Sequence, residues 1–140
     1  DARLVLIGSF SDDIASDAAR LIAADSRIVH LGFLPGPQFV QALAAADLYV
    51  QPGSVSQNAQ TALCCGTPVV LRDHPIYVDL VNGAGLTLRD AHEVGATIQH
   101  LLDSPGLLEV MSREAREVGR RRLDYRHQYE RIRGVDASNL

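Results

Sequence analysis

Apolar residues lie along the chain in short continuous runs, separated by longer stretches of mixed polarity. Such runs are typical of strands that are buried on both faces of a parallel sheet. They predict strands over residues 4–7, 28–31, 48–50, 68–71 and, more weakly, 85–88. Each of these strands should therefore be covered on both sides by other elements.

The stretches between these runs carry apolar residues at every third or fourth position, which is the spacing of one helix face. This spacing predicts a first helix that is capped by Asp12 or Asp13, further helices over residues 37–46, 56–65 and 90–102, and a last one that starts near Ser104-Pro105. Residues 73–81 should be irregular. Because strands and helices alternate, the sequence predicts an α/β fold, a three-layer Rossmann-like domain with a mostly parallel sheet.

The two ends of the chain carry separate predictions. The Rossmann-like domain should cover residues 1–119, and a C-terminal helical tail should cover residues 120–140. This tail is rich in arginine, and Leu123, Tyr125 and Tyr129 would dock it as a terminal helix. The chain starts directly on a strand without Met, so we expect it to be a piece of a longer polypeptide.

Composition argues against several classes of function. A chain of 140 residues fits one domain. Its net charge of −4 and its lack of Trp argue against binding to nucleic acids or anionic membranes. All 13 basic residues are arginine, which excludes mechanisms that need a lysine Schiff base or a P-loop lysine. No apolar run reaches transmembrane length, so no membrane-spanning segment is expected in this chain.

The cysteines and histidines give no sign of a metal site. Cys64 and Cys65 are neighbours inside a predicted helix, and we interpret them as small buried residues in a reducing compartment, the cytoplasm. His30 lies at the end of a predicted strand and His74 follows one, and structural roles such as local hydrogen bonds are expected for both. No histidine pair has ligand spacing with a carboxylate, so we expect neither a metal nor a cofactor.

The most informative stretch, residues 47–71, reads as a strand, a Gly/Ser turn, a short helix and a second strand. Ligands of open α/β sheets bind at such turns, where the first amides of the helix suit a phosphate or a sugar hydroxyl. Ser54 and Ser56 are the expected helix caps, and Gly53 would allow close backbone approach. The candidate binding residues are Gly53, Ser54, Ser56, Gln57, Asn58 and Thr61.

Two alternatives remain at this site. The turn and helix start could form a helix cap without any ligand. Arg72 and Arg89 also follow strands and could meet a phosphate, although pairing with acidic residues on the surface is the expected role for both.

A family resemblance is carried by five segments in this order: LVLIG, IVHLGFLP, AADLYVQPGS, TALCCGTPVVL and GAGLTLRDAHEVGATIQHLLDSPGLLEVMSREAREV. Together they resemble the C-terminal domain of GT-B glycosyltransferases, nearest to the large retaining family of lipopolysaccharide, capsule and mannosyl transferases. The resemblance covers about residues 4–118 and implies the half of a GT-B fold that binds a nucleotide-sugar donor without a metal. It also implies that the domain lacks its first strand and helix here. The partner would be an N-terminal Rossmann-like domain of the same polypeptide.

The resemblance also assigns roles by position. The nucleobase loop corresponds to Gly32, Phe33 and Leu34. The turn over residues 54–58 corresponds to the loop that touches the donor sugar and phosphate. Thr61 stands where the family has the second Glu of an E-x7-E motif, and the first Glu has no counterpart. Gln57 or Asn58 would then serve as neutral hydrogen-bond partners, and no catalytic residue is identified.

The resemblance implies transfer of a sugar from a nucleotide-sugar to a hydroxyl acceptor once the domain is joined to its N-terminal partner. The missing acidic pair leaves a first alternative, a glycosyltransferase-like module that binds a partner without transfer. A second alternative is an isomerase domain like that of nucleotide-sugar 2-epimerases. That reaction requires groups for proton transfer, which the site lacks.

Overall fold

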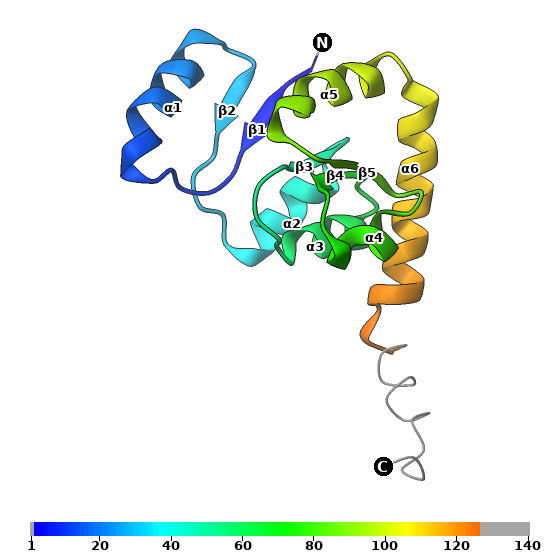
Figure 1. Cartoon of the computed structure of the whole chain (residues 1–140). Coiled ribbons are helices and arrows are strands. Elements are labelled where there is room, and N and C mark those ends of the chain that lie inside the picture. Colours follow the sequence, from blue (N-terminus) through cyan, green and yellow to red (C-terminus); the bar gives the residue numbers. More distant parts are fainter. Residues whose placement is uncertain (1, 127–140) are drawn as a thin grey trace. The chain divides into compact units, whose positions relative to one another are not determined.

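The computed structural model describes residues 2–126 (Figure 1). The chain divides into two compact units, unit 1 over Asp1–Phe39 and unit 2 over Val40–Leu140. Helix α2 (Gly36–Ala44) spans the point of division. Among the described residues, none of the helices combines the length and the apolar character that a membrane crossing needs.

Unit 1 contains β1 (Leu4–Leu6), α1 (Asp12–Ala24) and β2 (Ile28–His30). The two strands are parallel, with Leu4 opposite Ile28, as the strand–helix–strand pattern predicts. The residue that caps α1 is Ser11, so the predicted cap at Asp12 or Asp13 is wrong. Both aspartates lie in the first turn instead, where their charges favour the positive end of the helix.

The strands of unit 1 are less covered than their sequence suggests. Leu4 is 47% exposed and Val5 is 49% exposed, so the prediction that this strand is buried on both faces is wrong. The reason is the small number of elements: two short strands and α1, which itself has no buried residue, cannot cover both faces of a sheet.

Unit 2 contains a three-stranded parallel sheet in the order β3 (Tyr49–Gln51), β4 (Val69–Arg72) and β5 (Gly85–Leu88). Tyr49 lies opposite Val69, and Val69 lies opposite Gly85. In Figure 1 these strands lie between α5 (Val94–Leu102) on one side and α3 (Asn58–Cys65) and α4 (Pro75–Val81) on the other. The predicted α/β fold with parallel strands and helices on both faces is therefore confirmed for this unit.

The core of unit 2 explains why the sheet is apolar throughout. Val69, Val70 and Leu71 of β4 are fully buried, which contributes roughly 1.5–3 kcal/mol for each side chain. On one face, Val70 and Leu88 pack with Leu101 of α5 and Met111 of α6 (Pro105–Val118). Because the central strand is covered on both sides, it fixes the position of the loops at its carboxyl end.

Two regions differ from their sequence prediction. Residues 73–81, expected to be irregular, contain helix α4. Its start is set by Pro75 in the first turn and by His74, whose Nδ1 accepts a hydrogen bond from the amide of Ile76 at 3.3 Å. The β-branched and aromatic residues of this segment are weak helix formers, so the sequence did not predict a helix that tertiary packing stabilises.

After the predicted 90–102 segment, which forms η1 (Ala91–Glu93) and α5, helix α6 begins at Pro105 as expected. It continues into one π-helical turn, η2 (Gly119–Leu123). Tyr125 is 79% exposed, so the prediction that it docks the tail is wrong, because the backbone turns extended at Asp124. Tyr129 lies outside the described residues, and the tail over residues 120–140 stays a prediction.

Candidate functional site

The predicted binding turn follows β3 at the carboxyl edge of the sheet in unit 2. We call residues 52–57 the corner loop. A side chain at Gly53 would meet nothing within 4 Å, and Gly53, Ser54 and Val55 are exposed. The corner is therefore open to solvent and is not filled by packed side chains.

The helix that follows the corner loop starts later than predicted. Its cap is Gln57, whose φ of −65° and ψ of −17° are already helical, so the prediction of Ser54 or Ser56 as the cap is wrong. Because the chain enters the helix through Gln57, Ser56 lies one residue too early to reach the second or third helical amide. Its Oγ accepts instead from the amide of Asn58 at 3.1 Å.

The backbone of the corner loop is held by a buried tyrosine from α4. The amide of Ser56 donates to the hydroxyl of Tyr77 at 2.7 Å. The same hydroxyl lies 3.3 Å from the carbonyl oxygen of Ser56, to which it donates. Tyr77 is only 2% exposed, so its hydroxyl is a fixed point for the loop. The role of Tyr77 could not be predicted from the sequence, because Tyr77 lies in the segment expected to be irregular.

A second tyrosine acts on the loop through a glutamine. The hydroxyl of Tyr49 donates to Oε1 of Gln51, and Nε2 of Gln51 donates to the carbonyl oxygen of Ser54 at 3.0 Å. Both residues lie on β3, where the sequence showed only a strand. A polar residue at the last position of an apolar strand was the signal that would have indicated Gln51.

The ionisation of Tyr49 is set by the surroundings of this contact. Burial, reinforced by the neighbouring Tyr77, raises the pKa of Tyr49 to about 12, while a hydrogen bond with the side chain of Asn58 opposes the shift. Tyr49 therefore remains a protonated donor at neutral pH.

Several backbone amides of the corner are without a partner. Within residues 2–126, the amides of Gly53, Ser54, Val55 and Gln57 donate to no protein acceptor. Further along α3, the amide of Thr61 and its Oγ1 both bond to the carbonyl of Gln57, at 3.2 and 3.4 Å. The open amides therefore belong to the loop and the start of the helix, where an anion or a hydroxyl oxygen would accept from them.

The other predicted group of residues follows β2 in unit 1. Gly32 has a φ of +64°, which favours glycine, and its carbonyl accepts from the amide of Gly8 at 2.8 Å. Phe33 is 80% exposed, and Leu34 is half-buried. His30 makes a hydrogen bond between the two strand ends, with its Nε2 lying 2.8 Å from the carbonyl oxygen of Gly8. The strand ends of unit 1 thus form a second ordered turn, with one large aromatic side chain in solvent.

Two arginines at the sheet edge are not paired as expected. Arg72 and Arg89 are exposed, and within the described part of the chain neither forms an ion pair with a side chain. The predicted surface pairing is therefore wrong. Gln51 lies opposite Leu71 in the strand pairing. The next residue on each strand is Pro52, the first residue of the corner loop, and Arg72, so the backbone of Arg72 lies beside the start of the loop. The corner loop itself carries no charged side chain.

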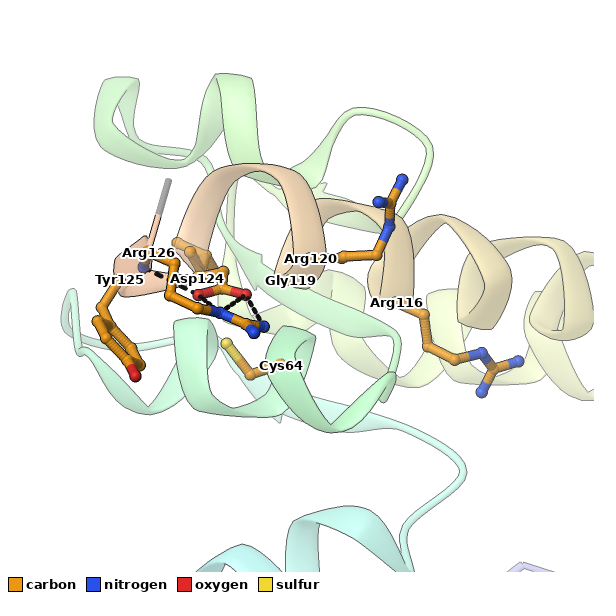
Figure 2. Close-up of a pocket in the computed structure, with 8 residues that line it drawn as sticks. Cys64, Arg116, Gly119, Arg120, Asp124, Tyr125 and Arg126 are labelled. Carbon is orange, nitrogen blue, oxygen red and sulfur yellow. Dashed lines mark hydrogen bonds and ion pairs between the residues drawn. The ribbon is translucent and has the colours of Figure 1, made fainter. Parts of the chain in front are cut away.

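A cavity of about 490 Å³ lies at the other end of α3. Its lining residues are Cys64, Arg116, Gly119, Arg120, Leu123, Asp124, Tyr125 and Arg126. Figure 2 shows the guanidinium of Arg126 bound to the carboxylate of Asp124 near Cys64, while Arg116 points away. Arg120 is bound to Glu117 at 2.9 Å. Since two of its arginines are neutralised by carboxylates, this cavity is a weaker candidate for an anionic ligand than the corner loop.

The cysteines are more accessible than predicted. Cys64 is exposed and Cys65 is half-buried, so their interpretation as buried residues is wrong. The inward face of α3 is formed by Ala59, Ala62 and Leu63, which turns the next residue outward. Partial burial still raises the pKa of the Cys64 thiol. Within residues 2–126, no group of three or more metal-binding side chains lies together.

Comparisons with known proteins identify a family and a fold. The family described as glycosyl transferases group 1 matches residues 1–104. The crystal structure of AviGT4, a glycosyltransferase involved in avilamycin A biosynthesis, is similar with a TM-score of 0.51 and 19% sequence identity. The match covers 93% of this chain and 43% of AviGT4, so the chain spans less than half of that protein.

At this identity, the likeness to AviGT4 supports only the fold, which is that of the C-terminal Rossmann-like domain of a GT-B glycosyltransferase. None of the curated proteins matches the chain in sequence. The family match extends over most of the chain, from the first strand through the helix before Pro105. The chain belongs to the glycosyl transferases group 1 family.

Proposed function

We propose that this chain is the nucleotide-sugar-binding domain of a two-domain glycosyltransferase. The observation that carries the proposal is the corner loop, where unbonded backbone amides lie at the carboxyl edge of a parallel sheet. Ligands of open α/β folds bind at this edge, and amides at a helix start favour phosphate oxygens. The family match supports sugar transfer as the activity.

The corner offers suitable groups for the two ends of such a donor. The amides of Gly53, Ser54 and Gln57 would donate to the diphosphate, aided by the positive end of α3. The sugar hydroxyls would be bound by neutral side chains, those of Ser54, Ser56, Gln57, Asn58 and Thr61. The nucleobase loop at Gly32, Phe33 and Leu34 stays a prediction made by position, and within unit 1 the exposed ring of Phe33 offers a stacking surface.

The reaction breaks the bond between the sugar carbon and the diphosphate and forms a bond from that carbon to an acceptor hydroxyl, which loses its proton. This chain would contribute by positioning the donor and stabilising the leaving diphosphate. The acceptor site and the proton acceptor would belong to an N-terminal Rossmann-like domain, since the match to AviGT4 covers only 43% of that protein. A role in the cytoplasm, and the narrower kinship with lipopolysaccharide, capsule and mannosyl transferases, stay predictions.

The open corner and the family match favour this function over a module that only binds a partner. The isomerase alternative is disfavoured because no carboxylate or histidine lies in the corner loop to transfer a proton. The loss of the acidic pair remains compatible with transfer, because the side chain of Asn58 is exposed and can hydrogen-bond a sugar or ribose hydroxyl.

The proposal is tested by calorimetry of the complete natural polypeptide with uridine, guanosine, adenosine and thymidine diphosphate sugars. At least one should bind, and Asn58→Ala should raise the donor KM about five- to tenfold through the loss of one hydrogen bond. Asn82→Ala is the matched control, because Asn82 is exposed and lies at the end of α4. Absence of heat with every nucleotide-sugar would overturn the proposal.

A further inference from the structure

We propose that Tyr77 and Gln51 are positioning residues that aim the unbonded amides of the corner loop at the donor diphosphate. This inference rests on the proposed function for its ligand, but its geometric part concerns the loop alone. Neither residue belongs to the predicted binding set. Each bonds to the loop backbone with a group that is fixed by another element of unit 2.

The planarity of the peptide group links the direction of each carbonyl to that of the amide that follows it. In a trans peptide, the carbonyl of one residue and the amide of the next lie in one plane and point in opposite directions. The structure has no cis peptide bonds in its described part. Holding a carbonyl in place therefore sets the direction of the amide that follows it.

In the second half of the loop, the hydroxyl of Tyr77 holds the peptide groups on both sides of Ser56. Its hydroxyl donates to the carbonyl of Ser56 at 3.3 Å, so the amide of Gln57 is directed away from Tyr77. Its hydroxyl also accepts from the amide of Ser56 at 2.7 Å, which fixes the preceding peptide plane. The amide of Gln57 has no protein acceptor within the described residues, so its direction is fixed and it remains available to a ligand.

In the first half of the loop, the side chain of Gln51 holds the peptide group that follows Ser54. Its Nε2 donates to the carbonyl of Ser54 at 3.0 Å, which directs the amide of Val55 to the opposite side. Tyr49 donates to Oε1 of Gln51 and so determines which end of the side-chain amide faces the loop. Val55 likewise has an amide without a protein acceptor in the part of the chain described.

The groups that hold the loop are rigid. Tyr77 is almost fully buried, its amide bonds to the carbonyl of His74 at 2.9 Å, and its ring meets the His74 ring edge-on at 6.4 Å between centroids. Gln51 is half-buried at the end of β3, next to the fully buried β4. Amides held in this way before the ligand arrives bind an anion without the entropy loss of ordering the loop.

The test compares Tyr77→Phe with the wild type in the complete natural polypeptide. The matched control is Tyr125→Phe, since Tyr125 is largely exposed and lines the cavity at the other end of α3. Amide hydrogen exchange of Ser56 and Asn58, the two amides of residues 53–58 that have an acceptor in the wild type, is measured first, without ligand. We expect exchange to become about tenfold faster in Tyr77→Phe alone, because the Ser56 amide loses its acceptor.

Donor binding is measured next, by calorimetry and by steady-state kinetics. In Tyr77→Phe, the donor KM should rise about five- to twentyfold while the acceptor KM is unchanged. A purely structural role would lower the thermal midpoint and the active fraction without this difference between the two KM values. Gln51→Met, which removes the bond to Ser54, should act in the same direction and replaces Tyr77→Phe if that variant does not fold.

The outcomes separate this inference from the proposed function. Unchanged exchange in both variants overturns the inference, and so does faster exchange with an unchanged donor affinity. Faster exchange in a protein whose wild type binds no nucleotide-sugar supports the aiming of the loop but overturns the proposed function and, with it, the donor as the ligand. Faster exchange together with a selective rise in the donor KM supports both.

Discussion

The polar groups at the two ends of α3 differ in whether they have partners. Before its first turn, the corner loop carries no charge and offers amides that have no protein acceptor among residues 2–126. After its last turn, Cys64 faces a cavity in which Arg120 and Arg126 are bound to carboxylates. The charged end has more ionic groups, but the neutral end has more groups that are free to bind. A binding site is therefore better identified by unsatisfied groups than by charge.

The largest effect should come from replacing glycines at these two ends. A side chain at Gly119 would lie 3.0 Å from the backbone of Leu63 and Cys64, whereas one at Gly53 would meet nothing within 4 Å. Gly119→Ala should therefore lower the free energy of unfolding by about 1–3 kcal/mol, because it forces η2 away from α3. Gly53→Ala should change it by less than about 0.5 kcal/mol.

Urea unfolding of the two variants measures this difference. If Gly53→Ala destabilised the protein as much as Gly119→Ala, the corner would be packed and the contrast between the two ends of α3 would be lost. If Gly53→Ala keeps its stability but weakens donor binding, close approach of a ligand to this backbone is supported.

A smaller effect is expected from the ionisation of Tyr49. Burial raises the pKa of Tyr49 from 10.0 to about 12, so the unfolded chain releases this proton before the folded one does. The contribution of Tyr49 to stability is thus complete below pH 10 and is lost as the pH rises from 10 to 12. Allowing for partial exposure, the loss should be about 1 kcal/mol.

Tyr49→Phe should remove this component of the pH dependence, as measured by urea unfolding between pH 8 and pH 12. Tyr125→Phe is the control, because the exposed Tyr125 makes no such contact. If the free energy of unfolding fell with the same slope above pH 10 in wild type and in Tyr49→Phe, the pKa of Tyr49 would not be raised in the folded protein.

The fold could be predicted from the sequence because it depends on apolar periodicity, which is local. The strand at residues 85–88 was predicted within its observed bounds, although its pattern is weak. The helix at Pro75–Val81 could not be predicted, because its residues favour strands and its buried face is set by packing. Exposure of Leu4 and Val5 could not be predicted either, because it depends on how many elements surround β1.

The candidate site could be predicted only in part. Its position at the carboxyl end of β3 follows from the order of strands and glycines along the chain. Its internal contacts do not, because the hydroxyl of Tyr77 reaches Ser56 across 21 positions of sequence. The cap at Gln57 was missed for a similar reason: two serines compete for the role, and tertiary contacts decide where the helix begins.

Arg72 allows a test of the role of charge at the corner. It is exposed and unpaired within the described residues, and it begins level with the corner loop, whereas Arg120 is bound to Glu117. Arg72→Gln should weaken donor binding about three- to fivefold and reduce its salt dependence, because an exposed charge attracts a diphosphate only modestly. Arg120→Gln should change neither quantity. Equal effects in calorimetry at two salt concentrations would contradict the assignment of the donor to the corner.

The smallest effect is expected at Cys64, at the far end of α3. Partial burial raises the pKa of its thiol, so alkylation near neutral pH should be slower than in the unfolded chain, and the rate should increase only at higher pH. In a Cys65→Ser background, saturating nucleotide-sugar should leave the alkylation rate of Cys64 unchanged, because the donor binds at the other end of the helix. Mass spectrometry of the alkylated peptide measures this rate. Protection of Cys64 by the donor would instead place the ligand in the arginine-lined cavity, and the contrast between the two ends would be reversed.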